Sequence, residues 1–234
     1  KFVTKGEIYL IPLPIHNLEE FNISSIPTIN IKHINTIKVF AVENIRTSRR
    51  FLKKVNPSIN IDELHFIEIN KRSTNQDYNQ IISIITEGNN VGVMSEAGCP
   101  GIADPGQALC EIAHQNNIKI IPLIGPSSII MALMASGLNG QQFSFHGYLP
   151  IKDNELNNKL NKIIKLPGAH IFIETPYRNE KLLKHLIKKL HPDKKLCIAT
   201  DINGKHEKII TKKIADMKDI QINLKKQPTI FIFE

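Results

Sequence analysis

Residues 91–106 have the sequence VGVMSEAGCPGIADPG, in which a short hydrophobic run leads into a loop rich in glycine and proline. The run 91–94 predicts a buried strand, because strands that are covered on both faces are short and continuously apolar. The next twelve residues contain two prolines and three glycines, which permit unusual backbone torsions and let a ligand approach the main chain. Most such connections need only about 2–6 residues, so this loop favours a binding role over a set of tight turns.

The rest of the first half continues this alternation of strands and helices. Hydrophobic runs rich in β-branched residues predict further strands at 7–11, 39–42, 64–69 and 118–123. Residues 74–87 carry apolar side chains at the spacing of an amphipathic helix. Asp104 and Pro105 predict the N-cap and first residue of another helix, and an apolar helix follows Ser127. This alternation is typical of an α/β fold with a mostly parallel sheet.

Three segments with special backbone follow predicted strands, at residues 11–14, 95–106 and 125–128. The carboxyl ends of parallel strands lie at one edge of a sheet, and open α/β sheets bind their ligands there. We therefore expect these three loops to converge on one binding cleft.

The second half of the chain has a different pattern. Its strands are predicted at 143–146, 170–174, 196–201, 208–211 and 229–233, with a helix at 179–190 between two of them. This less regular order predicts an α+β domain with a mixed sheet. Prolines and a glycine within 122–126 accompany the change, so the predicted domains are residues 1–123 and 124–234.

The excess basic charge lies entirely in the second predicted domain. The formal net charge is +8, yet residues 1–123 contain 12 basic and 12 acidic residues, whereas residues 124–234 contain 18 and 10. One-sided positive charge attracts polyanions such as nucleic acid. The chain contains 25 lysines but only 5 arginines, and it contains 41 isoleucines. This composition is also typical of AT-rich coding sequence, so charge alone does not establish an RNA partner.

Several classes of protein are disfavoured by what the sequence lacks. It contains no Walker A, dinucleotide-binding, zinc-protease or serine-hydrolase motif, and its nine histidines lack metal-ligand spacing. Its three cysteines form no C-x-x-C pair, so neither a disulfide framework nor a zinc knuckle is expected. No apolar run approaches the ~20 residues of a membrane span and no signal peptide is visible, so we expect a cytoplasmic protein without a metal centre.

With their neighbouring segments, these loops resemble a known family. The stretch 95–106, followed by IPLIGPS (121–127) and FSFHGYLP (143–150), resembles the tetrapyrrole (corrin/porphyrin) methylases. Three further segments are similar to the branch that methylates the ribose 2′-oxygen of a cytidine in bacterial 16S ribosomal RNA: YLIPLPIHNL (9–18), AVENIR (41–46) and FIETPYR (172–178). The match is collinear and covers almost the whole chain.

This resemblance implies two α/β domains, usually in a homodimer, with S-adenosylmethionine (SAM) bound as methyl donor in the cleft between them. The helix N-terminus after Ser127 would suit the carboxylate of SAM, and nearby acids would tolerate its sulfonium cation. The residues that the resemblance implies for SAM binding are Pro12, Ser95, Glu96, Ala97, Gly98, Ile102, Asp104, Gly125, Pro126 and Ser127.

Two acidic residues are expected beside the reacting hydroxyl. Glu43 and Glu96 would orient or deprotonate a ribose hydroxyl, and the competing interpretation of each is a surface or helix-capping carboxylate. Because methyl transfer is an in-line displacement on an activated methyl group, positioning should contribute most of the catalysis, and a strong base is not required.

Five residues are expected to contact the substrate. Arg46 would meet RNA phosphate, and Asn75 is similar to an asparagine of the ribosomal RNA branch; the alternatives are a solvated helix face and an ordinary residue of a helix N-terminus. In the second domain Tyr148, Glu174 and Arg178 resemble cleft residues, and Tyr148 would stack on a base. Core packing with a structural ion pair is the alternative for these three.

Some positions differ from the ribosomal RNA branch. Where this chain has Glu96 and Cys99, that branch usually has Asp and Thr. Members of the branch also continue beyond the position of the last predicted strand. The first loop keeps the Pro-x-Pro-Ile of that branch at residues 12–15. We therefore expect a SAM-dependent methyltransferase that acts on ribosomal RNA or the small ribosomal subunit. The alternatives are methylation of a tetrapyrrole or another small molecule, and a SAM-binding protein without catalytic activity.

Overall fold

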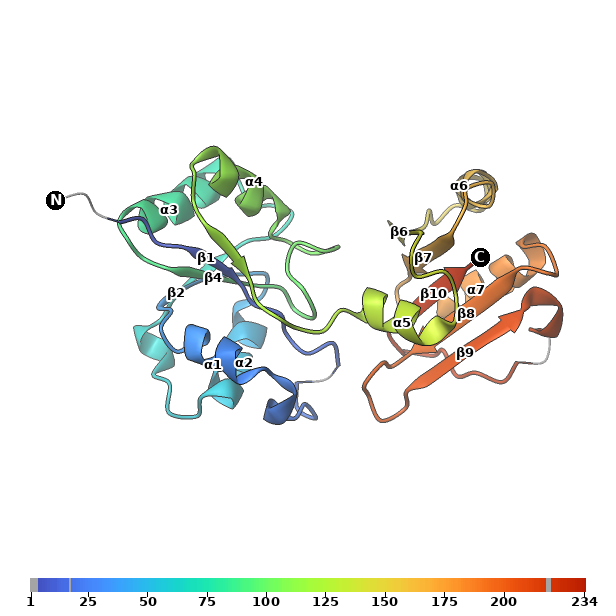
Figure 1. Ribbon diagram of the computed structural model, residues 1–234, viewed down its shortest axis with the longest axis horizontal. Helices are drawn as coiled ribbons and strands as arrows, with labels where there is room; N and C mark the ends of the chain where they lie inside the picture. Colours follow the sequence, from blue (N-terminus) through green and yellow to red (C-terminus); the bar gives the residue numbers. More distant parts are fainter. Residues whose placement is uncertain (1–3, 17, 218–219) are drawn as a thin grey trace. The chain divides into compact units, whose positions relative to one another are not determined.

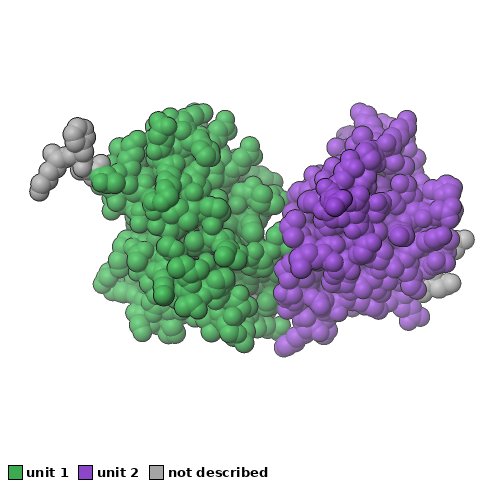
Figure 2. Space-filling view, in the orientation of Figure 1, with its two compact units in different colours: residues 1–127 green, residues 128–234 purple. Residues whose placement is uncertain are grey.

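The computed structural model describes residues 4–16, 18–217 and 220–234, within two compact units, residues 1–127 and 128–234 (Figure 2). The division falls four residues after the predicted domain boundary. Residues 124–127 belong with the first unit because the Asn30 side chain donates to the Ile124 carbonyl at 2.6 Å. The Cys99 thiol likewise donates to the Pro126 carbonyl at 3.3 Å. No helix in the described part of the chain is long and apolar enough to span a membrane.

The first unit is a parallel sheet with helices on both faces (Figure 1). Helices α1 (Thr28–Ile34) and α2 (Ile45–Val55) cover one face, and α3 (Asn75–Thr86) and α4 (Gln107–Gln115) cover the other. The strands, in the spatial order β3-β2-β4-β1-β5, are β3 (His65–Glu68), β2 (Val39–Val42), β4 (Val91–Met94), β1 (Ile8–Leu10) and β5 (Ile120–Pro122). All four pairings are parallel, which confirms the predicted α/β architecture.

Alternation along the strands divides the core of this unit into two clusters. Phe40 of β2 packs with Phe51 of α2 on one face, whereas the next residue, Ala41, packs with Ile81 and Ile85 of α3 on the other. Because successive side chains of a strand point to opposite faces, both faces of the sheet must be apolar. Burial of each large side chain contributes about 1.5–3 kcal/mol.

Helix α3 begins where the sequence predicts, but α4 does not. Thr74 is the N-cap of α3, and its backbone N–H donates to the Asp77 carboxylate at 2.7 Å in a capping box. Helix α4 begins only at Gln107, after Gly106 with φ 134°, so the expectation that Asp104 and Pro105 start this helix is wrong. Ala103 has φ 63°, and this left-handed residue keeps the segment before Gly106 in the loop.

The second unit contains a mixed sheet in the order β6-β7-β10-β8-β9 (Figure 1). Its strands are β6 (Phe143–Tyr148), β7 (Ala169–Ile173), β8 (Lys195–Thr200), β9 (Lys208–Lys213) and β10 (Thr229–Phe233). β6 pairs parallel to β7, and the other pairs are antiparallel. This confirms the predicted mixed sheet and α+β class of the second half.

Helices cover both faces of the second sheet. Leucines of α6 (Asp153–Ile163) and α7 (Asn179–Lys189) pack with Phe172 and Phe231 of the central strands. On the opposite face lies α5 (Ser128–Ser136), and the Thr211 hydroxyl of β9 donates to the Ser136 carbonyl at 2.7 Å. The stripe of leucines at 179–190 that predicts α7 therefore forms the buried side of this helix.

Candidate functional site

The loops that follow β1, β4 and β5 meet at the carboxyl edge of the first sheet. Leu13 and Gly98 exchange two backbone hydrogen bonds, with N–O distances of 2.9 and 3.0 Å. The thiol of Cys99 reaches the Pro126 carbonyl and so ties the second loop to the third. The three loops predicted to converge therefore do so within the first unit.

Close packing explains the glycines in these loops. A Cβ atom at Gly125 would overlap the ring of Pro12, so the third loop lies against the first only because residue 125 has no side chain. Gly98 has φ 65°, in the left-handed region that favours glycine, at the point where it pairs with Leu13. These loops thus bring bare backbone to one edge of the sheet.

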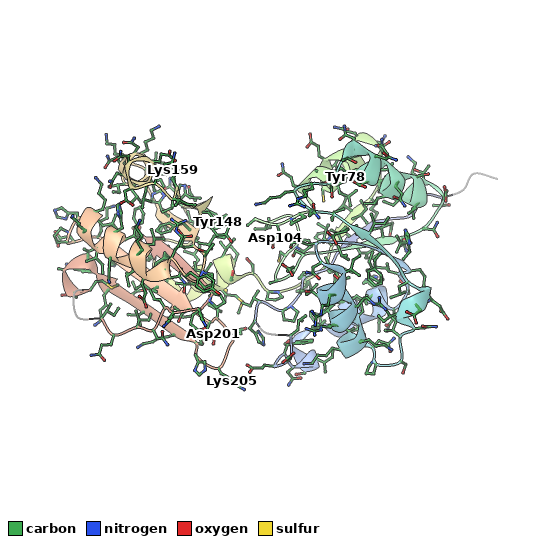
Figure 3. The ribbon with its side chains drawn as sticks, turned by 180° about the vertical axis from the view of Figure 1, so that it is seen from behind. Tyr78, Asp104, Tyr148, Lys159, Asp201 and Lys205 are labelled. Carbon is green, nitrogen blue, oxygen red and sulfur yellow. The ribbon has the colours of Figure 1, made fainter. Side chains whose placement is uncertain are left out.

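Three carboxylates gather at the start of the loop that follows β4. The backbone N–H of Glu96 donates to Glu43 Oε2 at 2.9 Å. Burial raises the pKa of Asp104 to about 6, the charges of Glu43 and Glu96 act in the same direction, and the nearby Ser95 side chain opposes them. Figure 3 labels Asp104 on the loop between β4 and α4. We call Glu43, Glu96 and Asp104 the acidic cluster; a positive charge beside it would be stabilised.

The junction of β2 and α2 positions Glu43. Its backbone N–H donates to the Met94 carbonyl at 3.0 Å, which continues the pairing of β2 with β4. Asn44 then caps α2, because its side-chain oxygen accepts from the Thr47 N–H at 3.1 Å. The Thr47 hydroxyl lies 3.4 Å from Glu96 Oε1, so α2 also contacts the second expected catalytic residue.

A hollow of about 580 Å³ opens beside the acidic cluster and α2. Its wall includes one carboxylate of the cluster and three side chains of α2. The lining residues are His16, Leu18, Glu19, Thr47, Arg50, Lys54 and Glu96. The sequence did not single out His16 or Thr47 as site residues, because their proximity depends on how the segment after β1 packs against α2.

The other residues expected to bind the cofactor lie in the same three loops. Ser95 is buried, and its hydroxyl donates to the Ala97 carbonyl at 3.1 Å. Ile102 is 53% exposed despite its apolar side chain. Ser127 is the last residue of the first unit and directly precedes α5. The first unit thus holds all ten residues that the resemblance implies for SAM binding.

Two residues expected to bind substrate also lie in the first unit. Arg46 is exposed on the first turn of α2, two residues after the N-cap Asn44. Asn75 is exposed on the first turn of α3. Within the described residues, no hydrogen bond joins either Arg46 or Asn75 to the acidic cluster.

The three expected residues of the second unit divide into an exposed aromatic and an ion pair. Tyr148 is 60% exposed at the end of β6 (Figure 3), after Gly147 with φ 64°. The Glu174 carboxylate is 1% exposed; its Oε2 lies 3.1 Å from Arg178 Nη2 and its Oε1 accepts from the Thr175 N–H at 2.7 Å. Arg178, 27% exposed, is the member of the pair that still reaches the surface.

A pair of histidines on β6 and β7 was not anticipated from the sequence. His146 Nε2 lies 3.0 Å from His170 Nδ1, and His170 Nε2 lies 3.1 Å from the Leu166 carbonyl. Because a carbonyl only accepts, His170 donates from Nε2 and accepts at Nδ1 from His146. Burial, followed by His170 and Lys159, lowers the pKa of His146 to about 4, so His146 is neutral near pH 7.

Comparison with known proteins finds similarity along both units. The family model described as tetrapyrrole (corrin/porphyrin) methylases matches residues 28–218. The chain is 32% identical to ribosomal RNA small subunit methyltransferase I of Buchnera aphidicola subsp. Schizaphis graminum, over 98% of this chain and 78% of that protein. It is 29% identical to the protein of the same name from Vibrio cholerae, over 90% of this chain and 69% of that protein.

Solved structures share the fold at much lower sequence identity. The methyltransferase CobJ superimposes with a TM-score of 0.64 at 16% identity, covering 97% of this chain and 93% of that one. Uroporphyrin-III C-methyltransferase from Thermus thermophilus, solved with S-adenosylhomocysteine, superimposes with a TM-score of 0.58 at 10% identity, covering 97% of both chains. At these identities the structures establish the fold.

Proposed function

Because this chain belongs to the tetrapyrrole (corrin/porphyrin) methylase family, we propose that it methylates the ribose 2′-oxygen of a nucleotide in small-subunit ribosomal RNA. It is an enzyme that uses SAM as methyl donor. One observation carries the choice of substrate: the identity of 32% over 98% of the chain to a ribosomal RNA small subunit methyltransferase I. Relatives of that name also match at 27–31% identity, which supports the same substrate class.

The acidic cluster fits a cationic cofactor. Asp104 has a raised pKa partly because it lies near Glu43 and Glu96, and the sulfonium of SAM would relieve this repulsion. When bound, SAM supplies a methyl group that the sulfonium activates for attack. We assign the holding of SAM to the backbone of the three converging loops of the first unit: Pro12, Ser95, Glu96, Ala97, Gly98, Ile102, Asp104, Gly125, Pro126 and Ser127.

Glu96 is the residue that we assign to the reacting hydroxyl. Its carboxylate accepts a hydrogen bond from the ribose 2′-hydroxyl, which orients the oxygen. It would take up the hydroxyl proton as the carbon–oxygen bond forms and the bond between the methyl carbon and the sulfur of SAM breaks, with S-adenosylhomocysteine as the leaving group. Glu43 accepts the Glu96 backbone N–H at 2.9 Å and thereby fixes the start of the loop. Positioning by these two residues supplies most of the catalytic effect.

The remaining assigned residues recognise the substrate. Arg46, exposed at the start of α2, contacts RNA phosphate, and Asn75 contacts the RNA from α3. In the second unit Tyr148 offers an exposed ring for stacking on a base. Arg178 contacts the RNA, and the buried Glu174 holds the Arg178 guanidinium in place at 3.1 Å.

The proposal includes a cytoplasmic homodimer that acts on the small ribosomal subunit. The family resemblance supports the dimer, and the ribosomal substrate supports the location. Sedimentation equilibrium of the purified chain tests the dimer, and a monomer across the concentration range would remove this part of the proposal.

Transfer of labelled methyl from SAM to small ribosomal subunits, isolated from cells that lack this protein, tests the function. Nuclease digestion is expected to release one 2′-O-methylated nucleotide. If the RNA stays unlabelled while SAM binds, the same preparation is offered uroporphyrinogen III, because structurally similar proteins are named as uroporphyrin methyltransferases. Label on the tetrapyrrole would replace the RNA proposal, and label on neither substrate would favour a SAM-binding protein without catalytic activity.

A further inference from the structure

The hollow beside α2 has an acidic wall at Glu96 and a basic wall at Arg50 and Lys54, and the exposed Glu19 also lines it. Glu96 and Thr47 lie on the acidic side, and Arg50 and Lys54 lie one and two turns further along α2. All of the lining residues belong to the first unit. The volume of the hollow, about 580 Å³, falls in the range of small-ligand sites.

Lys54, one of the two basic residues of the hollow, is held in place by contacts within the protein. Lys54 Nζ donates to the carbonyls of Leu18 and Glu19, at 2.6 and 2.9 Å, and lies 5.2 Å from the centre of the Phe21 ring. These contacts fasten the segment after β1 to α2. Lys54 therefore builds the wall, and its donors are already engaged by the protein.

Arg50 differs from Lys54 because its guanidinium is not engaged. No hydrogen bond or ion pair among the described residues includes Arg50, although it lines the hollow. The adjacent Arg49 instead lies 3.3 Å from Asp62 in an exposed ion pair and does not line the hollow. The two neighbouring arginines of one helix thus face different surroundings.

His16 also lines the hollow, from the segment after β1. His16 Nδ1 is buried without a hydrogen-bond partner within the described part of the chain. Because this nitrogen is buried, it does not offer a hydrogen bond to the open space of the hollow. His16 therefore contributes to the wall, and the unpaired Arg50 guanidinium is the basic group that remains available to a ligand in the hollow.

We infer that this hollow binds the phosphodiester beside the methylated ribose, with the Arg50 guanidinium on the phosphate and Glu96 toward the sugar. The inference rests on the proposed function and adds a subsite to it. Guanidinium groups form paired hydrogen bonds with phosphate oxygens, and the carboxylate accepts from a ribose hydroxyl. Both ends of one nucleotide unit thus meet groups of suitable charge.

Arg50→Gln and Arg49→Gln provide a matched pair of variants, because each removes one positive charge from the same turn of α2. Arg50→Gln is expected to raise the KM for small ribosomal subunits about 10- to 100-fold, the loss expected for a charge-assisted hydrogen bond. It should also reduce the slope of log affinity against log salt by about 0.7, as for one phosphate contact on single-stranded RNA. In Arg49→Gln the KM and the salt slope should stay within twofold of the wild-type values. The Kd for SAM should be unchanged in both variants.

Arg50→Lys separates charge from geometry, since it keeps the charge but loses the planar fork. Arg50→Lys should keep the wild-type salt slope. Its KM for small ribosomal subunits should lie between the values of the wild type and Arg50→Gln. Equal effects of Arg49→Gln and Arg50→Gln would overturn the subsite and leave the proposed function intact. A SAM Kd that rises with the RNA KM in Arg50→Gln would assign the hollow to the cofactor and also overturn the subsite. Failure of the wild-type enzyme to methylate RNA would overturn both proposals.

Discussion

At the scale of single residues, Glu96 is the side chain on which the proposed chemistry depends most. Replacement by glutamine keeps the shape and removes the proton acceptor, so Glu96→Gln is expected to lower kcat about 10²- to 10⁴-fold. Single-turnover methyl transfer to small ribosomal subunits at saturating SAM measures this effect.

Glu111→Gln is the matched control for Glu96→Gln, because Glu111 is an exposed carboxylate of α4. Its kcat should remain within twofold of the wild-type value. If Glu96→Gln also stays within tenfold, the carboxylate does not take the proton and positioning alone accounts for catalysis.

Asp104 carries a second prediction at this scale, on stability. Its folded pKa of about 6 lies above the usual aspartate value of 3.8, so the folded state holds the proton more tightly than the unfolded state does. Stability from this group is therefore present below about pH 4 and is lost as the pH rises through 6. After allowance for solvent screening, Asp104→Asn should raise the free energy of unfolding by about 1 kcal/mol near pH 7.5 and by nothing near pH 3.5.

Urea unfolding at the two pH values measures this difference. Asp77→Asn serves as a contrast, because the hydrogen bond from the Thr74 backbone holds the pKa of Asp77 below its usual value. That substitution should lower stability near pH 7.5, and the loss should shrink as the pH falls. A destabilised Asp104→Asn protein near pH 7.5 would show that the ionised carboxylate is stabilised where it lies.

At the scale of elements, the contact between the first and third loops depends on a missing side chain. Gly125→Ala would place a Cβ atom into the Pro12 ring, which should cost about 1–3 kcal/mol and weaken SAM binding. Gly140→Ala is the control, since a Cβ there meets nothing within 4 Å. Thermal unfolding and calorimetric titration with SAM check both variants; an unchanged SAM affinity in Gly125→Ala would remove this loop from the cofactor site.

The positions of the strands could be predicted closely, because strands buried on both faces require short hydrophobic runs. Val39–Val42, Val91–Met94 and Thr229–Phe233 agree with the prediction at both ends. The start of α4 could not be predicted, since Asp104-Pro105 is typical of a helix start and only the torsions of Ala103 and Gly106 place it in a loop.

The candidate site could be predicted as a set of loops but not as a set of contacts. Parallel strands require their carboxyl ends to share an edge, which brings the loop of Glu96 to that of Leu13. The bond from Glu96 to Glu43 and the pair of His146 with His170 depend on how loops and neighbouring strands meet in three dimensions. Local sequence patterns carry no information on such cross-element contacts.

At the scale of the whole molecule, the uneven charge predicts how RNA binding responds to salt. The entire excess of +8 lies in residues 124–234, so RNA affinity should fall steeply between about 50 and 200 mM salt because counterions are released on binding. SAM affinity should change little over the same range. Filter binding of ribosomal RNA and calorimetry with SAM check this; an RNA affinity that does not respond to salt would count against an RNA substrate.

Part of that charge has a consequence for how chains associate. Strand β9 lies at one edge of the second sheet, and Lys208, Lys212 and Lys213 are exposed along it. An edge strand offers unpaired backbone groups on which another chain can add, and lysines at such an edge oppose that addition by repulsion between copies. These three lysines therefore protect the folded protein from aggregation through β9, whether or not they ever contact RNA.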